Sequence, residues 1–116
     1  MCRIFIATHF KRQLKTYTKK YRSISDDVAD FLDCFDKRQH DDLVKGVYKA
    51  RLKSRDIQRG KSKSFRVIVF LTEVEGLLAP IAIYFKGDKE DVSETEINDH
   101  LEEVLYELQR EGIFSV

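Results

Sequence analysis

The densest group of side chains that could bind a ligand lies between residues 45 and 66, where nine lysines and arginines accompany one acid, Asp56. Such cations bind phosphate, and a guanidinium can hold two phosphate oxygens at once. Lys49 and Arg51 are two residues apart, which in a β-strand places both on one face. Because like charges on one face repel each other, the pattern favours a phosphate-binding surface; the alternative is a solvated strand face followed by a basic loop.

Arg66 is the second notable feature, because it is the only charged residue in the run Phe65–Thr72. An arginine in a strand that is otherwise suited to burial is usually paired or functional. Tyr84 and Lys86 share a face of a later strand in the same way. We therefore expect five side chains to converge on one open basic surface, on the sheet face away from the helices: Lys49, Arg51, Arg66, Tyr84 and Lys86.

The first third of the chain is predicted to contain a strand at Arg3–Thr8 and then two antiparallel helices over residues 9–38. Apolar residues recur every three or four positions along the first helix, at Phe10, Leu14, Tyr17, Tyr21 and Ile24. Ser25, followed by two aspartates, is typical of the start of a second helix. Its apolar face would consist of Val28, Phe31, Leu32 and Phe35.

The rest of the chain reads as three strands and a helix. The strands are predicted at Val47–Lys53, Phe65–Thr72 and Leu77–Lys86, and Pro80 requires an edge or a bulge because it cannot donate a ladder hydrogen bond. Ser93 and Glu96 form a capping-box pattern that begins the last helix, and Gly112 suits its end. The order β-α-α-β-β-β-α predicts an α+β fold, with helices on one face of a small, mostly antiparallel four-stranded sheet.

The composition predicts one domain over residues 1–116, with 42% hydrophobic residues available for a core. The net charge of +1 conceals strong segregation: residues 1–22 carry seven cations and no acid, whereas residues 86–116 carry three cations and ten acids. No apolar run is long enough for a signal peptide or a membrane span, so we expect a cytoplasmic protein without a membrane partner. We also expect no metal and no cofactor, since the potential ligands have no metal-binding spacing: Cys2, Cys34, His9, His40 and His100.

Several short motifs occur in a particular order between residues 47 and 97. They are Tyr48-Lys49-Ala50-Arg51-Leu52, Arg59-Gly60-Lys61-Ser62, Phe65-Arg66-Val67-Ile68, Ile83-Tyr84-Phe85-Lys86-Gly87-Asp88-Lys89-Glu90-Asp91-Val92-Ser93 and Glu96-Ile97. In order and spacing they resemble the RelE/HigB-type toxins of bacterial type II toxin–antitoxin systems, within the RelE/ParE superfamily. The resemblance implies a RelE-like, microbial-RNase-like fold, which agrees with the predicted order of elements.

The resemblance implies a ribosome-dependent endoribonuclease, or mRNA interferase, that inhibits translation without a metal ion. In that reaction the RNA 2′-hydroxyl attacks its own 3′-phosphate. Arg51 and Arg66 would stabilise the phosphorane, Lys49 would act as base, and Lys86 or Tyr84 would protonate the leaving oxygen. Further cations would bind mRNA or ribosomal RNA at the ribosomal A site: Lys45, Lys53, Arg59, Lys61, Lys63, Lys89, Lys11, Lys15 and Lys19. The implied partner is a cognate antitoxin with a helix-turn-helix domain, similar to HigA.

The chain departs from the family pattern at two places. Many relatives have two glycines where this chain has Lys63 and Ser64, and the tyrosine that some members use as general base has no counterpart, although Ser93 stands nearby. Two alternatives therefore stay open. One is a non-catalytic, ParE-like toxin that acts on DNA gyrase, and the other is a plain nucleic-acid-binding module on the same scaffold.

Overall fold

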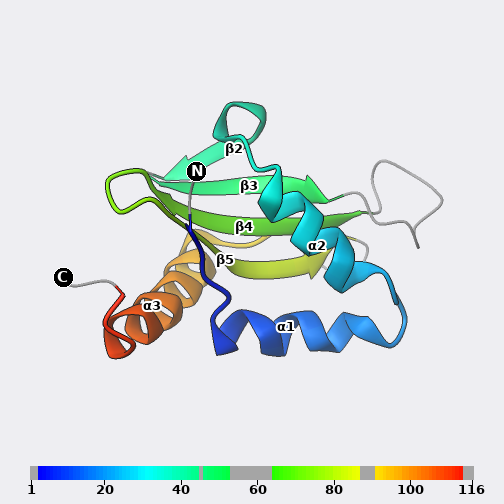
Figure 1. Ribbon diagram of the computed structural model, residues 1–116. Helices are drawn as coiled ribbons and strands as arrows, with labels where there is room; N and C mark the ends of the chain where they lie inside the picture. Colours follow the sequence, from blue (N-terminus) through cyan, green and yellow to red (C-terminus); the bar gives the residue numbers. More distant parts are fainter. Residues whose placement is uncertain (1–2, 45, 53–63, 87–90, 114–116) are drawn as a thin grey trace.

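The computed structural model describes residues 3–44, 46–52, 64–86 and 91–113 (Figure 1). Its elements follow one another as β1 (Arg3–Ile4), α1 (Thr8–Thr18), α2 (Ile24–Asp33), the short 3₁₀ helix η1 (Lys37–Gln39), β2 (Asp41–Val44), β3 (Val47–Leu52), β4 (Phe65–Thr72), β5 (Leu77–Phe85) and α3 (Glu94–Arg110). The strands form one sheet in the order β1-β5-β4-β3-β2. β1 runs parallel to β5, and all other neighbouring strands are antiparallel.

The α+β class is confirmed, but the predicted count of four strands is wrong. The additional strand is β2, which pairs with β3 at the sheet edge. Its four residues include two aspartates, which are depleted in strands, so the pairing with β3 overrides the local preference. The first strand is also shorter than predicted, because α1 already begins at Thr8.

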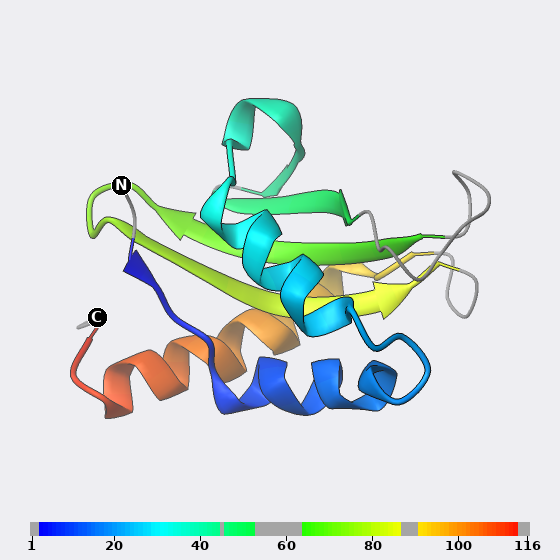
Figure 2. The same cartoon turned by 45° about the vertical axis from the view of Figure 1, so that its right-hand side comes forward.

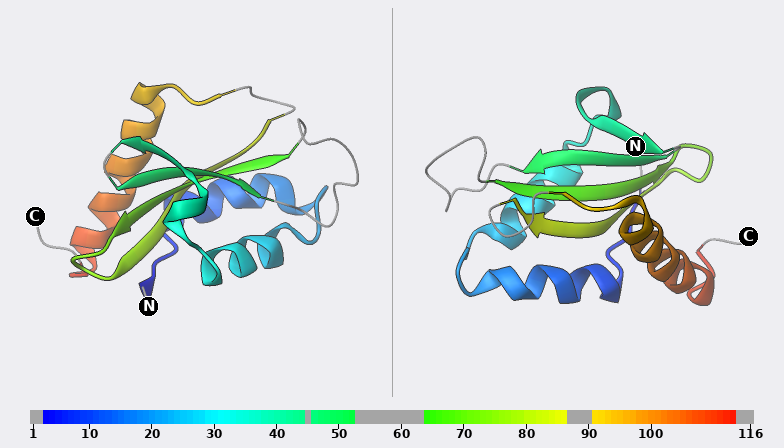
Figure 3. Two further views of the ribbon diagram at one scale, coloured as in Figure 1. Left: turned by 90° about the horizontal axis from the view of Figure 1, so that it is seen from above. Right: turned by 180° about the vertical axis from the view of Figure 1, so that it is seen from behind.

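Helices cover both faces of the sheet, so the prediction that they share one face is wrong. On one face, Phe10 of α1 and Val28 of α2 pack against Val67 and Val69 of β4. On the other, α3 packs its buried side chains (Ile97, Val104 and Leu108) against residues that include Ile68 and Ile81. Viewed from behind, α3 lies in front of the sheet, whereas in Figure 1 α2 crosses in front (Figure 3). The physical reason is that β4 and β5 are apolar on both sides, and each side needs a cover.

The boundary between the first two helices differs from the prediction. α1 ends at Thr18, and Ile24, which the periodicity assigns to the first helix, is the first residue of α2. The three-or-four spacing runs through the intervening turn because Phe10, Tyr17 and Ile24 all face the same core. Asp26 and Asp27 do lie in the first turn of α2, as predicted.

Three local predictions for the second half of the chain are confirmed. The β4–β5 register shifts between Ile68 and Val69, opposite Ala82 and Pro80, which is the expected bulge. Ser93 and Glu96 form a reciprocal capping box at the start of α3. Gly112 follows α3 with a φ of 70°, a left-handed conformation that favours glycine.

β1 pairs only with Leu77 and Leu78 at the beginning of β5, so the rest of that edge has no neighbouring strand. Side chains of α1 form hydrogen bonds to it instead. The Gln13 amide donates to the Ile81 carbonyl at 3.0 Å, and its oxygen accepts from the Ile83 amide at 3.2 Å. The Tyr17 hydroxyl accepts from the Phe85 amide at 3.3 Å. These bonds hold α1 along β5 (Figure 2) and satisfy backbone groups that would otherwise form an open sheet edge.

Glu107 of α3 caps the start of α1, whose first turn contains no acid of its own. Its carboxylate accepts the amides of Thr8 at 2.8 Å and His9 at 3.0 Å. Burial opposes ionisation of Glu107, but these hydrogen bonds outweigh that effect and hold its pKa below the usual value. The contact joins the helices that cover opposite faces of the sheet. None of the described helices is long and apolar enough to cross a membrane.

Replacing Gln13 with alanine should destabilise the fold, because the Ile81 carbonyl and the Ile83 amide would lose their partners. Leaving such part-buried backbone groups unpaired costs about 1–3 kcal/mol in the free energy of unfolding, which urea denaturation measures. Gln109→Ala, at an exposed position of α3, is the matched control. Equal unfolding free energies for the two variants would show that Gln13 does not support the edge of β5.

Candidate functional site

The centre of the site is a row of three side chains, Arg51, Arg66 and Tyr84, which we call the arginine row. Arg51 on β3 lies directly opposite Arg66 on β4, and Arg66 lies directly opposite Tyr84 on β5. Directly opposed residues of antiparallel strands have their Cβ atoms only about 5 Å apart. The neighbours of Arg66 in β4, Phe65 and Val67, face α1 and α2, so the row faces the other side of the sheet.

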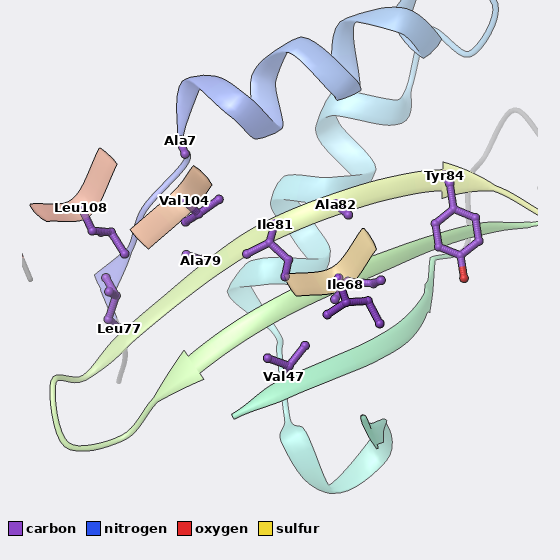
Figure 4. Packing of buried hydrophobic residues seen from close by; sticks show 11 residues of the cluster. Ala7, Val47, Ile68, Leu77, Ala79, Ile81, Ala82, Tyr84, Val104 and Leu108 are labelled. Carbon is purple, nitrogen blue, oxygen red and sulfur yellow. The ribbon is translucent and has the colours of Figure 1, made fainter. Parts of the chain in front are cut away.

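Figure 4 shows where Tyr84, the member of the row on β5, lies along that strand. Leu108 and Val104 of α3 lie toward the Leu77 end of the strand, whereas Tyr84 lies at the opposite end. Of the five side chains predicted to share the face opposite the α1–α2 pair, the strand register places Lys49, Arg51, Arg66 and Tyr84 there, whereas Lys86 lies beyond the end of β5. The predicted openness of that surface does not agree with the structure, because only 7% of Arg66 and 6% of Tyr84 are exposed.

Arg66 is a buried cation, and the side chain that accepts a hydrogen bond from it is uncharged. Its Nη1 atom donates to the hydroxyl of Ser64, and among the described residues no carboxylate lies within ion-pair distance of its guanidinium. Burial lowers the pKa of Arg66, and the neighbouring charge of Arg51 lowers it further. Arginine nevertheless stays charged in proteins, so the row holds positive charge that an anion would stabilise.

Tyr84 is arranged as a hydrogen-bond donor. Burial and the negative charge of Asp91 raise its pKa to about 12, so the phenol is protonated at neutral pH. Its hydroxyl lies 3.4 Å from Oδ1 of Asp91. Tyr84 can therefore donate a hydrogen bond or a proton to a phosphate oxygen, and at neutral pH it is not available as a base because the tyrosinate form is scarce.

Asp91 joins the arginine row to Lys49. The Lys49 Nζ atom lies 3.5 Å from the same Oδ1 atom that contacts Tyr84. A hydrogen bond from the Val92 amide and the charge of Lys49 lower the pKa of Asp91, so its carboxylate is ionised at neutral pH. The sequence pattern surrounds Lys49 with cations only, whereas the structure adds an acid from a distant segment. Asp91 is thus a second candidate proton acceptor beside Lys49.

The other predicted site residues are divided by the structure. Lys86 is half-buried and directly follows β5, and its amide donates to the Ser64 carbonyl at 3.0 Å. The exposed Lys11 and Lys15 lie on α1, which packs its buried Phe10 on the face opposite the row, and the exposed Lys19 directly follows α1. The structure therefore does not bring Lys11, Lys15 and Lys19 together with the row. Six predicted RNA contacts lie outside the described residues: Lys45, Lys53, Arg59, Lys61, Lys63 and Lys89.

Ser64 and Asp91 belong to the site but were not assigned to it from the sequence. Ser64 stands two residues before Arg66, so the period of a strand places both on one face, and that signal was available. Asp91 lies inside one of the short motifs, but its contact with Lys49 spans 42 residues along the chain. Local periodicity carries no information about such a contact.

Two of the three histidines form a close pair, although their spacing in the sequence does not suggest one. His9 Nε2 lies 2.7 Å from His100 Nδ1, where α1 meets α3. His40 instead stacks on Phe35, with ring centroids 5.1 Å apart. Within the part of the chain that the structure describes, no three histidine, cysteine or acidic side chains are grouped to hold a metal ion.

Fold and site together define a small α+β protein in which the arginine row, with Arg66 and Tyr84 buried and Arg51 exposed, lies on one face of a mixed five-stranded sheet. No protein-family model matches the chain. A search of curated proteins finds no match either. The assignment of a function therefore depends on the arrangement of the residues themselves.

Tyr84→Phe should change how stability depends on alkaline pH. The pKa of Tyr84 is raised from 10.0 to about 12 on folding, so its stabilising effect is complete below pH 10 and is lost as the pH rises through about 12. Urea unfolding between pH 8 and about 11.5 should show a steeper loss for the wild type than for Tyr84→Phe. Tyr106→Phe, at an exposed position, is the control. Parallel curves for wild type and Tyr84→Phe would contradict the assigned shift.

Proposed function

We propose that this protein is a ribosome-dependent endoribonuclease, the RelE/HigB-type toxin of a type II toxin–antitoxin system. The observation that carries the proposal is the pair of opposed arginines, Arg51 and Arg66, of which the buried Arg66 has no carboxylate within ion-pair distance among the described residues. Two opposed guanidiniums can grip the oxygens of one phosphate group. RNA supplies such a phosphate together with an adjacent nucleophile.

The proposed reaction is an intramolecular transesterification. The 2′-oxygen forms a bond to the adjacent phosphorus while the bond from phosphorus to the 5′-oxygen breaks, which leaves a 2′,3′-cyclic phosphate and a free 5′-hydroxyl. The nucleophile therefore comes with the substrate. The protein has to align the groups, stabilise the charge on the phosphorane, and transfer one proton from the 2′-hydroxyl and one to the 5′-oxygen.

Each of these tasks has a candidate in the site. Arg51 and Arg66 stabilise the developing negative charge. Tyr84, protonated because of its raised pKa, donates the proton to the 5′-oxygen, with Lys86 as the second candidate. Lys49 or the ionised Asp91 accepts the proton of the 2′-hydroxyl, since the two groups contact each other beside Tyr84. This mechanism requires neither a metal nor a cofactor.

The proposal includes the biological setting that the resemblance implies. The toxin would act in the cytoplasm, at the ribosomal A site, on mRNA held beside ribosomal RNA. Exposed cations on and just after α1, including Lys11, Lys15 and Lys19, belong to a helix that packs on the other face of the sheet and would contact RNA other than the cleaved phosphate. A cognate antitoxin with a helix-turn-helix domain would restrain the activity.

Arg66→Ala should abolish toxicity while the protein stays folded. Losing one preorganised donor to a transition-state oxyanion typically costs about 3 kcal/mol, or on the order of a hundredfold in rate. The measurement is mRNA cleavage in a cell-free translation reaction, mapped to single nucleotides, together with growth arrest on induction. Arg110→Ala, at an exposed position at the end of α3, is the control.

The outcomes of that experiment separate the proposed function from its alternatives. Codon-phased cuts by the wild type, greatly reduced in Arg66→Ala, would support the proposal. Growth arrest by Arg66→Ala equal to that by the wild type would show that Arg66 is not catalytic. Inhibition without RNA cuts would instead favour a ParE-like action on DNA gyrase or simple nucleic-acid binding.

The antitoxin complex should weaken as salt is added, because acidic groups of the partner would cover Lys49, Arg51 and Lys86. Exposed charge pairs are screened over about 8–10 Å at physiological ionic strength. The dissociation constant should therefore rise along a salt series, and less steeply for Lys49→Ala than for the wild type. A complex indifferent to salt would indicate inhibition by bulk alone, and overexpression of the single protein without slowed translation would argue against a dedicated inhibitor.

A further inference from the structure

Ser64 occupies a special place beside the arginine row. Only 9% of it is exposed, and it lies directly before β4. Its carbonyl accepts the Lys86 amide at 3.0 Å, which ties it to the end of β5, and its hydroxyl accepts a hydrogen bond from Nη1 of Arg66. The hydroxyl is thus held at one position relative to two strands, and the guanidinium is held by the hydroxyl.

We propose that Ser64 is a positioning residue that orients Arg66 toward an incoming phosphate without neutralising its charge. This inference rests on the proposed function, because it concerns the binding of the same phosphate. It deepens that function by naming the group that holds the Arg66 guanidinium in its binding orientation when no substrate is bound.

The chemistry of the partner is the main support. A buried guanidinium needs hydrogen-bond acceptors, and a carboxylate would be the strongest one. A carboxylate would also neutralise the positive charge of Arg66, which is the charge that attracts an anionic ligand. A hydroxyl satisfies an N–H donor and leaves the positive charge in place. Among the described side chains, no fully buried nitrogen or oxygen lacks a hydrogen-bond partner.

The nearby acid is directed elsewhere in the site. Asp91 contacts Lys49 and Tyr84, and its side chain is 68% exposed. Its charge reaches Arg66 only through space, where it partly offsets the repulsion from Arg51. The division of partners therefore leaves Arg66 with a neutral acceptor, while the exposed acid holds the lysine and the phenol.

The Ser64 hydroxyl can contact Arg66 and the ligand at the same time. A serine hydroxyl that accepts from Arg66 still has its own hydrogen, which it can donate to a phosphate oxygen. The Ser64 hydroxyl thus provides both an anchor for the guanidinium and a donor toward the ligand.

The test compares four variants of the full-length protein: Ser64→Ala, Ser64→Thr, Ser64→Asp and, as a control at an exposed position of α2, Ser25→Ala. Inorganic phosphate is the probe, and its binding is followed through the NMR signal of the Arg66 Nε–H group. Cleavage in the translation reaction is measured as kcat and KM separately, and urea unfolding reports stability. Arg66→Ala is included in the cleavage and unfolding assays.

Ser64→Ala should weaken phosphate binding about tenfold, the effect of losing a hydrogen bond to a charged group, and should lower kcat. Ser64→Thr, which keeps the hydroxyl, should restore both. Ser64→Asp should abolish phosphate binding while remaining at least as stable as Ser64→Ala, because the new carboxylate pairs with Arg66. A merely structural role would not separate binding from stability in this way. Ser25→Ala should behave as the wild type.

The possible failures are distinguishable. If Ser64→Ala binds phosphate and cleaves as the wild type does while Arg66→Ala is inactive, the positioning role is wrong and the proposed function stands. If Arg66→Ala cleaves as well as the wild type, Arg66 is not catalytic and the positioning role of Ser64 fails with it. If the wild type itself cuts no mRNA, the proposed function fails. Should Ser64→Ala not fold, the other two variants decide: phosphate binding by folded Ser64→Asp would overturn the inference, and binding by Ser64→Thr alone would support it.

Discussion

Keeping a positive charge inside a β-sheet is the physical constraint on which the rest of the site depends. Removing an ion from water costs several kcal/mol even after the protein relaxes, and the opposed Arg51 adds repulsion to that cost for Arg66. The hydroxyl of Ser64 and the through-space effect of Asp91 offset part of it. The rest of this desolvation and repulsion cost is not offset within the protein, so the site is more stable with an anion bound. This stabilisation by an anion links the fold to the proposed chemistry.

Such a site requires strands that cannot shift relative to one another. β4 and β5 are covered on both faces, by α1 and α2 on one side and by α3 on the other. Along the edge of β5, Gln13 and Tyr17 provide the hydrogen bonds that a further strand would have made. Glu107 then joins α3 to α1. The elements far from the row thus fix the register of β3, β4 and β5, and this register places Arg51, Arg66 and Tyr84 directly opposite one another.

The segregation of charge along the chain has a structural counterpart. Asp91, which lies shortly before the acidic α3, contacts Lys49 of the basic strand β3, and Glu107 of α3 caps the beginning of the basic α1. The recorded ion pairs are largely exposed, and such pairs contribute little to stability. The pair between Lys49 and Asp91 has a geometric role in the site, because one carboxylate oxygen of Asp91 contacts both the lysine and the phenol of Tyr84.

The sequence by itself determined the elements whose periodicity is clean: the two central strands, the capped last helix, the bulge at Pro80 and the exceptional Arg66. Hydrophobic period and capping are local properties, so they can be seen without a fold. Tertiary structure alone decided that β2 pairs with β3, that α3 covers the second face, and that Asp91 reaches Lys49. These outcomes depend on which segments meet across the sheet, because burial and long-range pairing override the weak local preferences of a short, acidic strand or of an isolated carboxylate.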